Sequence, residues 1–248
     1  MSATEADFWN TLPLGREVGV LTVDENGLAA LAKPAGVLSH PNDAADAPRS
    51  LLQASYTTEG EYYHWTDPAG ERRLWLLNRL DSATSGVILM CADAELAEVM
   101  KLHFRQKRVR KVYNALVFGR PQSSVQIWRD RLAVQRQAGH IRTSAQGHIP
   151  AESRMTLLRA RGGHALLRLE PITGRSHQLR VQCAKRGLPI VGDATYGDFA
   201  RNRDFARRTK HKRMFLHSLE TSFDYEFRGR HCHFSAKAPL PVEFDTAL

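Results

Sequence analysis

The stretch NRLDSATSG places Arg79 and Asp81 two positions apart, directly before the apolar run VILMC. A half-buried ion pair is costly to hold, so residues of these types at this spacing need a functional reason. A cation close to a carboxylate favours its ionised form, which makes Asp81 a candidate for chemistry at a charged oxygen. Two further polar residues stand in apolar surroundings: Tyr113 in a strand-like segment and Arg180 in a helical one.

Each of these residues alone also has a structural explanation. Asp81 can form a turn, Tyr113 can be a core aromatic with a satisfied hydroxyl, and Arg180 can pair with a buried carboxylate. His231 and His233 in the segment HCH share one side of a strand, but two ligands are too few for a zinc site. The sequence has no P-loop, dinucleotide fingerprint or G-x-S-x-G elbow. It therefore indicates neither a metal nor a nucleotide cofactor.

The elements that must position these residues begin with a hairpin. Two short strands are expected at 18–24 and 28–32, joined by an Asn-Gly turn. Residues 40–73 are rich in Asp, Pro, Gly and aromatic residues, and they predict an irregular excursion with one short helix around 50–56. The apolar run after Asp81 predicts a continuous strand.

Downstream, Asp93 is expected to cap a helix that runs to about Gln106, with an inward apolar stripe. The segment KVYNALVFG predicts an alternating strand with Tyr113 on one face. Residues 125–170 indicate short strands, and RSHQLRVQCAKR predicts a helix that Gly187 ends. MFLHSLETSFDYEF and HCHFSAKAP predict closing strands. The class is therefore α+β, with a mainly antiparallel, mixed β-sheet flanked by helices and loops.

The charge is the compositional outlier. The chain of 248 residues has a formal net charge of +9, concentrated in KLHFRQKRVRK at 101–111 and RNRDFARRTKHKR at 201–213. A single run of this kind can equally be a solvated helix face or a flexible loop. Two runs on a strongly basic chain favour nucleic acid as the partner.

Cysteine usage and termini bear on the compartment. Cys91, Cys183 and Cys232 are odd in number and far apart, which fits a reducing compartment rather than a disulfide framework. The sequence has no apolar run of membrane-helix length, and MSATEADFWN has acidic residues where a signal peptide has basic ones. We expect a cytoplasmic protein with an N-terminal tail or arm over 1–15 and one domain over 16–248.

Taken together, five segments resemble the RluA-type RNA pseudouridine synthases, in the order of that family. They are AKPAGVLSHP, NRLDSATSGVILM, RKVYNALVFGR, PITGRSHQLRVQCAKRGLPIVGDATYG and RMFLHS, and the resemblance extends from about residue 19 to 240. It implies the pseudouridine synthase catalytic fold with a central RNA-binding cleft. It also implies isomerisation of uridine in ribosomal or transfer RNA to pseudouridine, without a metal or an organic cofactor.

The resemblance also implies roles for individual residues. In such enzymes the bond to N1 of uracil is broken, the base rotates, and carbon 5 is joined to the sugar. Asp81 would be the catalytic carboxylate and Arg180 the residue that pairs with it. Tyr113 would stack on the target base and help to remove the proton from carbon 5, while Leu216 would pack against the base. Arg79 would enter the space that the flipped uridine leaves in the stack.

The remaining RNA-binding candidates are mostly basic. Lys33 is expected to position the first motif or to contact a phosphate. Further RNA contacts are expected from the third motif and from the first basic run, at Arg175, His177, Lys107, Arg108 and Arg110. The family usually has His where this chain has Asn78, so HRLD becomes NRLD; Asn keeps a hydrogen-bonding side chain and lacks a titratable ring.

Two other functions stay open from the sequence. A non-catalytic RNA-binding or RNA-folding protein could keep the same fold, although Asp81, Tyr113 and Arg180 are all present. A glycosylase or nuclease that uses Asp81 would need a metal cluster or a second acidic group, which the sequence does not indicate. The expectation is a cofactor-independent RNA pseudouridine synthase that acts as a monomer.

Overall fold

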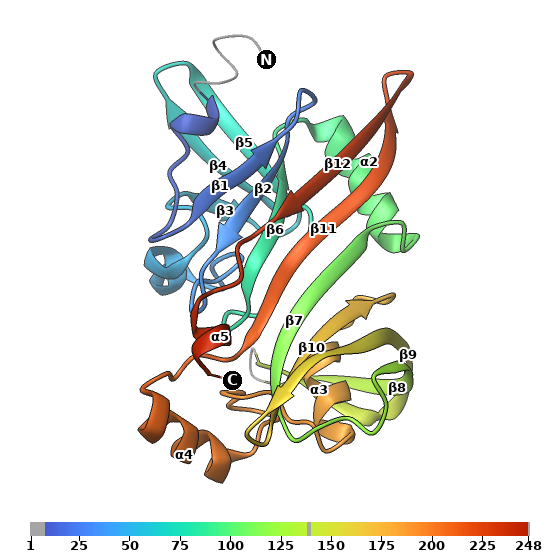
Figure 1. Cartoon of the computed structure of the whole chain (residues 1–248). Helices are drawn as coiled ribbons and strands as arrows, with labels where there is room; N and C mark the ends of the chain where they lie inside the picture. Colours follow the sequence, from blue (N-terminus) through green and yellow to red (C-terminus); the bar gives the residue numbers. More distant parts are fainter. Residues whose placement is uncertain (1–7, 138–139, 248) are drawn as a thin grey trace. The chain divides into compact units, whose positions relative to one another are not determined.

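In the computed structural model, which describes residues 8–137 and 140–247, the chain divides into two compact units (Figure 1). Unit 1 contains the described residues up to Val109 together with Glu220–Ala238, and unit 2 contains Arg110–Leu219 together with the described residues from Pro239 onward. Each unit has its own hydrophobic core. The tail expected over 1–15 lies partly outside the described residues; within it, Trp9 and Leu12 are buried.

Unit 1 consists of antiparallel strands together with the 3₁₀ helix η1 and the α-helix α2. Its elements are β1 (Gly19–Val23), β2 (Leu28–Lys33), η1 (Ala44–Arg49), β3 (Ser55–Thr57), β4 (Tyr62–Asp67), β5 (Gly70–Leu76), β6 (Ser85–Cys91), α2 (Ala94–Arg105), β12 (Arg230–Lys237) and most of β11 (Leu216–Phe227). The pairings β1–β2, β2–β6, β3–β4, β4–β5, β5–β6 and β11–β12 are all antiparallel.

The first hairpin follows from its turn chemistry. Asp24 Oδ1 accepts hydrogen bonds from the main-chain N–H groups of Asn26 (2.9 Å) and Leu28 (2.8 Å). Gly27 takes the left-handed backbone that the turn needs, with φ of 85°. The predicted β1–β2 hairpin is confirmed.

The prediction for residues 40–73 was wrong. The structure has three antiparallel strands, β3, β4 and β5, where an irregular excursion was expected. The only helical turn nearby is η1, which precedes the expected helix at 50–56 because Asp43 accepts from the N–H groups of Ala45 and Asp46 and so starts it earlier. The Asp and Gly residues that suggested a loop form the β4–β5 turn, where Asp67 accepts from Ala69 N–H at 2.8 Å.

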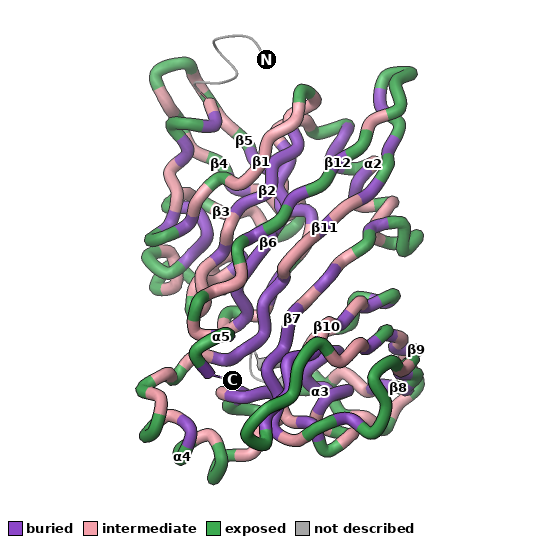
Figure 2. The backbone as a smooth tube through the Cα atoms, viewed as in Figure 1, coloured by how far each residue is buried: buried purple, intermediate pink, exposed green. Residues whose placement is uncertain are grey.

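The expected strand and helix after Asp81 are confirmed. All residues of β6 are buried, as Figure 2 shows along this strand. Asp93 caps α2 by accepting from Leu96 N–H at 2.9 Å, and Leu96 and Met100 face a core shared with β6 and with Phe223 of β11. β6 is therefore a rigid, two-sided support for the loop that precedes it.

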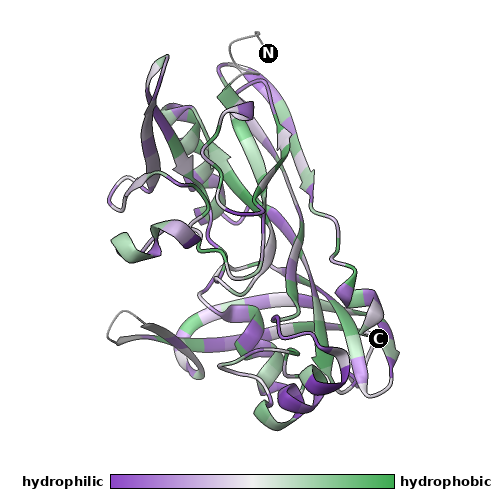
Figure 3. Ribbon diagram, turned by 90° about the vertical axis from the view of Figure 1, so that its left-hand side faces the viewer, coloured by the Kyte–Doolittle hydropathy of each residue, from purple (hydrophilic) through white to green (hydrophobic). Residues whose placement is uncertain are grey.

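Unit 2 is a second antiparallel arrangement with short helices. Its elements are β7 (Arg110–Phe118), β8 (Val125–Gln137), β9 (His140–Arg161), β10 (His164–Pro171), α3 (Gln178–Lys185), α4 (Phe199–Thr209), the first residues of β11, and α5 (Glu243–Thr246). β10 pairs with both β7 and β9, and β9 pairs with β8. β8 and β9 are long, so the prediction of short strands here was wrong. Figure 3 shows hydrophilic and hydrophobic residues interspersed along the ribbon, so hydropathy alone does not indicate whether a strand is long or short.

Left-handed backbone occurs at the start of α3, directly after its end, and at the end of α4. α3 begins only after His177, whose φ is 55°, and so starts later than the sequence predicts. Gly187 ends it as predicted, donating its N–H to Ala184 O at 3.0 Å. The second basic run winds into α4, which Asp198 caps and which ends at Lys210 with φ of 65°.

The α+β class with a mainly antiparallel sheet is confirmed. All three cysteines are free thiols, with Cys91 and Cys183 buried. None of the described helices is long and apolar enough to cross a membrane.

Two glycines with similar backbone angles predict different costs of substitution. A Cβ on Gly192 (φ 77°) would lie 1.9 Å from Arg213 O, whereas a Cβ on Gly229 (φ 73°) would meet no atom within 4 Å. Gly229→Ala should cost about 1–2 kcal/mol for its left-handed backbone. Gly192→Ala should cost about 1–3 kcal/mol more, because main chain must move. Urea denaturation of both variants measures the loss in the free energy of unfolding. Equal losses in the two variants would contradict the close approach of Gly192 to the main chain of Arg213.

Candidate active site

The loop between β5 and β6 carries Arg79, Leu80 and Asp81 with alternating exposure. Arg79 is exposed, Leu80 is buried, and Asp81 is partly exposed. The main-chain carbonyl of Asp81 accepts from Thr84 N–H at 2.9 Å, which closes a turn directly before β6. Leu80 thus acts as an anchor, and the two charged side chains flank it.

Ser39, from the first motif, fixes this anchor from both sides. Its Oγ donates to Leu80 O (2.9 Å) and accepts from Leu80 N–H (3.0 Å), so one hydroxyl satisfies both main-chain groups of a buried residue. Tyr63 on β4 donates its hydroxyl hydrogen to Ser39 O at 2.9 Å. Burial raises the pKa of Tyr63, which keeps this hydroxyl a donor.

Lys33 connects the first motif to the same loop. Its side chain is buried, and Nζ donates to Pro34 O (3.0 Å), Val37 O (2.6 Å) and Ser82 O (3.0 Å). Gly36 N–H donates to Ser82 O as well, at 2.7 Å. An ammonium has three N–H donors, and these contacts join the first motif to the loop of Asp81.

Asn78, where the related motif has His, also holds the loop. Its Oδ1 accepts from Leu89 N–H of β6 at 2.8 Å, and the neighbouring Leu77 N–H donates to Leu89 O at 3.0 Å. The amide thereby extends the contact between the loop and β6 by one hydrogen bond. A carbonyl-type acceptor is sufficient for this, so a titratable ring is not needed at position 78.

In unit 2, Tyr113 lies on β7 opposite Leu169 of β10 and is partly exposed. Alternation along the strand puts Lys111 on the same face of β7 as Tyr113. Burial lowers the pKa of Lys111, and its Nζ lies near Gly174 of the third motif. Leu216 is buried at the first position of β11.

Arg180 forms a two-pronged ion pair with Asp193. Nε donates to Oδ2 at 2.7 Å and Nη2 donates to Oδ1 at 2.8 Å, with both side chains buried. Oδ1 also accepts from the N–H groups of Thr195 (2.8 Å) and Tyr196 (3.0 Å). The guanidinium carbon lies 5.0 Å from the centre of the Tyr196 ring. Burial acts to raise the pKa of Asp193, but the Arg180 partner and the two N–H groups outweigh it, and the pKa lies below its usual value.

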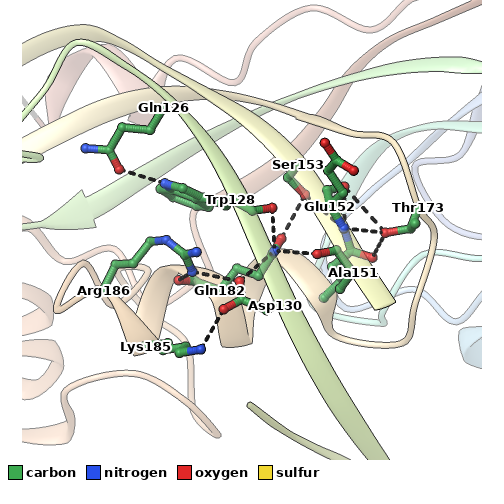
Figure 4. Close-up of polar contacts among 11 residues, drawn as sticks. Gln126, Trp128, Asp130, Ala151, Glu152, Ser153, Thr173, Gln182, Lys185 and Arg186 are labelled. Carbon is green, nitrogen blue, oxygen red and sulfur yellow. Dashed lines mark hydrogen bonds and ion pairs between the residues drawn. The ribbon is translucent and has the colours of Figure 1, made fainter. Parts of the chain in front are cut away.

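The α3 helix that carries Arg180 is fixed to β8 and β9 by buried polar groups (Figure 4). Gln182 Nε2 donates to Asp130 Oδ2 at 2.9 Å, and Ser153 Oγ donates to Gln182 Oε1 at 2.8 Å. Gln178, one turn earlier, donates to Ser153 Oγ at 2.9 Å. Lys185 pairs with Asp130 at 2.7 Å. A satisfied buried network of this kind fixes one orientation of a helix.

The third motif arranges its other candidates around Tyr196. His177 Nδ1 lies 2.8 Å from Tyr196 Oη, and the same hydroxyl oxygen accepts from Thr143 N–H at 2.9 Å. Arg175 is exposed, and its Nε donates to Pro150 O at 3.3 Å. His177 therefore supports the turn beside Arg180, while Arg175 lies at the surface.

The first basic run divides at the boundary of the units. Lys107 and Arg108 follow α2 in unit 1 and are exposed. Arg110 begins β7 in unit 2, where its Nη2 pairs with Glu170 at 2.9 Å. A phosphate at Arg110 would therefore compete with a carboxylate.

Sequence reasoning missed several supporting residues. Ser39 and Asp193 lie inside the quoted motifs, so each was available as a polar residue in a motif without an assigned role. Lys111 could have been found from its two-residue spacing to Tyr113. Asn202 carried no signal: its Oδ1 accepts from Gly192 N–H (2.7 Å) and its Nδ2 donates to Asp193 O (3.0 Å), which fixes the main chain beside Arg180.

Comparisons with known proteins identify related sequences. Residues 27–185 match the protein family described as RNA pseudouridylate synthase. An uncharacterized RNA pseudouridine synthase of Chloroflexus aurantiacus is 32% identical over 219 residues, which cover 87% of this chain and 64% of that protein. The tRNA pseudouridine synthase C of Yersinia pestis is 29% identical over 240 residues, 90% of this chain and 87% of that protein. Ribosomal large subunit pseudouridine synthase C of Haemophilus influenzae is 28% identical over 240 residues, 92% and 70% respectively.

Solved structures show the same fold. Human RNA pseudouridylate synthase domain containing 1 has a TM-score of 0.67 at 21% identity and covers 93% of this chain and 87% of its own. Human RNA pseudouridylate synthase domain containing 4 has the same TM-score and identity, and the match covers 99% of this chain and 94% of that protein.

The Arg180–Asp193 pair predicts a pH-dependent contribution to stability. Asp193→Asn should lower the free energy of unfolding by about 3–5 kcal/mol at neutral pH, because a buried guanidinium loses its counter-charge. The folded pKa of Asp193 is lowered, so this difference should be complete above the unfolded pKa of about 3.9 and shrink as the pH falls through the folded pKa.

Urea denaturation of both proteins at a series of pH values measures the difference. Asp245→Asn, at an exposed ion pair of the same unit, is the control and should change stability by less than about 0.5 kcal/mol. A loss of stability that stays constant down to the lowest pH would contradict an ionised Asp193.

Proposed function

The chain belongs to the RNA pseudouridylate synthase family, and from this premise we propose that it isomerises uridine in RNA to pseudouridine with Asp81 as the catalytic carboxylate. The observation that carries the assignment is the loop of Asp81. Its neighbour Leu80 is buried and bonded through both main-chain groups, and the adjacent Ser82 is bonded to buried Lys33. Asp81 itself stays partly exposed. A reactive side chain on a rigidly held loop is what preorganised chemistry requires.

The reaction is an isomerisation, so every atom of the base is kept. The bond from the sugar to N1 breaks and a bond from the sugar to carbon 5 forms. The hydrogen on carbon 5 leaves as a proton and N1 takes up a proton, so the composition of the base is unchanged. In the proposal, the Asp81 carboxylate attacks or stabilises the sugar during the detached stage. In the same proposal, the positive charge of Arg180 favours the ionised form of the Asp81 carboxylate. Nε and Nη2 of Arg180 donate to Asp193, and the pairing of Arg180 with Asp81 is a proposal from the family motifs.

The other assigned residues handle the base and the strand. Tyr113 stacks on the uracil and helps to remove the carbon 5 proton, and Leu216 packs against the ring. Arg79, exposed beside the anchored Leu80, enters the stack where the uridine has left, since a planar guanidinium can replace a base there. These are proposals from the family motifs. Arg79 is exposed and Tyr113 is partly exposed, whereas Leu216 is buried.

RNA is the partner, and its backbone is the ligand of the basic residues. We assign phosphate contacts to the exposed Lys107, Arg108 and Arg175. Arg110 contributes in competition with Glu170, and His177 acts through the Tyr196 turn. The names of the relatives include a transfer RNA enzyme and large-subunit ribosomal RNA enzymes, so both RNA classes are test substrates. We propose a cytoplasmic monomer that needs no cofactor.

The assignment predicts that Asp81→Asn abolishes turnover. Release of tritium from RNA labelled at carbon 5 of uridine should fall by about three orders of magnitude or more, because the nucleophilic oxygen is lost. The dissociation constant for the same RNA should change little. Total transfer RNA and ribosomal RNA from cells that lack the protein serve as substrates.

Asp224→Asn is the matched control, since this carboxylate is exposed in the same unit and pairs only with the surface His233 among its described contacts. It should keep full activity. Turnover by Asp81→Asn close to that of the unmodified chain would overturn the assignment. RNA binding without turnover by the unmodified chain would favour a non-catalytic RNA-binding protein.

A further inference from the structure

The α4 helix of unit 2 borders a groove that none of the roles above uses. Its volume is about 350 Å³, and it lies against the β9–β10 turn. Its lining includes Phe118, Gly162, His164, Arg201, Asp204 and Arg208. The lining joins two arginines of one helix with two rings from neighbouring strands.

The floor of the groove is built from packed rings. The ring centres of Phe118 and His164 lie 5.3 Å apart, and those of His164 and Phe205 lie 5.6 Å apart. Phe205 is the buried residue of α4 and joins a core with Phe118 and Phe215. The helix is therefore fixed to the sheet, and its arginines have a defined base.

The arginines that line the groove carry more positive charge than the one acidic residue of α4 neutralises. Arg201 lies over the Phe118 ring, 4.3 Å from its centre, and its Nη2 donates to Gly163 O at 3.4 Å. Arg208 pairs with Asp204 at 3.1 Å, but Asp204 also pairs with Arg207 at 3.2 Å. Residues 201–213 contain seven Lys or Arg and this single acidic residue. Positive potential is left over at the groove.

His164 gives a second, independent indication. It is only 8% exposed, and within the described part of the chain its Nε2 has no hydrogen-bond partner. Burial lowers its pKa, a hydrogen bond of the ring to the main chain of Gly162 partly opposes this, and the nearby Arg201 and Arg208 lower the pKa further. Arg161 is its ladder neighbour on β9. A buried polar atom without a partner, surrounded by cations, marks a place that an anionic ligand with hydrogen-bonding groups would complete.

We propose that this groove binds a phosphodiester of the substrate RNA. The occupant rests on the proposed function, and one feature favours a strand over a small phosphate compound: the basic run continues past the groove through Lys210, Lys212 and Arg213. A single phosphate needs only the two groove arginines. A row of cations along and beyond a helix matches the repeated charge of a nucleic acid backbone.

The groove acts on affinity and leaves the chemistry unchanged. Asn202 is the α4 residue that bonds to the Gly192–Asp193 main chain beside Arg180. Arg201 and Arg208 make their described contacts elsewhere, with Phe118, Gly163 and Asp204. Removing the two arginines should therefore leave the Arg180–Asp193 pair in place.

The test compares two double variants of the same helix. Arg201→Ala/Arg208→Ala removes the groove charges, and Arg203→Ala/Arg207→Ala removes two exposed charges of α4 that do not line the groove. RNA affinity is measured by fluorescence anisotropy over a series of salt concentrations, and turnover is measured separately. The groove variant should bind about tenfold more weakly, and the slope of log K against log salt should fall by about 1.5, as expected for two lost phosphate contacts. Its KM should rise while kcat stays within about twofold.

The control variant should show a smaller loss of affinity and little change in slope. In the unmodified chain, addition of RNA should shift the NMR signals of the His164 ring. Equal effects of the two variants would mean that α4 attracts RNA through diffuse charge, which would overturn the groove. If the groove variant binds RNA with unchanged affinity and Asp81→Asn is inactive, the proposal that the groove binds RNA is overturned and the proposed function is kept. If the unmodified chain binds RNA through the groove but shows no turnover, the groove proposal is supported and the proposed function is overturned.

Discussion

The buried pair of Arg180 and Asp193 is the constraint around which the helical part of unit 2 is organised. Removing two charges from water costs several kcal/mol per ion, and only good geometry offsets this. Here the carboxylate receives two guanidinium bonds and two main-chain N–H bonds. These donors come from α3 and from the turn at 195–196, and Asn202 of α4 fixes the main chain of Asp193. One carboxylate thus determines the relative placement of three segments.

Unit 1 also contains a buried charge, and main-chain groups contact it. The ammonium of Lys33 is buried, and it donates to main-chain carbonyls of its own motif and of Ser82. Ser39 and Asn78 then attach Leu80 and β6 to the same loop. Each bond is worth only about 1 kcal/mol of net stability, so their main effect is to reduce the number of conformations available to the loop. The hydrogen bonds thus fix the main chain of the loop that carries the charged side chains.

The parts of the fold that the sequence predicted are those decided locally. The β1–β2 turn, the Asp93 cap and the Gly187 ending depend on residues within a few positions of one another. Two errors are also local, the early turn capped by Asp43 and the late start of α3 at His177, but the larger errors concern pairing at a distance. β3 to β5 contain aromatic residues between Asp- and Gly-rich turns, and only their mutual pairing distinguishes them from a loop. The partners of the charged site residues had the same difficulty: Lys33 and Ser82 are 49 positions apart, and Ser39 and Leu80 are 41 apart.

The two basic runs show why a charge pattern alone does not locate an RNA contact. Both are similar in composition, yet the first is divided between the end of α2 and the start of β7. One of its arginines pairs with Glu170, which also pairs with Arg168. Residues 201–209 of the second run lie in a single helix, α4, whose one acidic residue is shared by two arginines. Which cations keep an unbalanced charge is thus decided by the acidic residues that folding brings to them. In α4 the apolar face fixes the helix through Phe205, and the helical period then places Arg201 and Arg208 along one side of the groove.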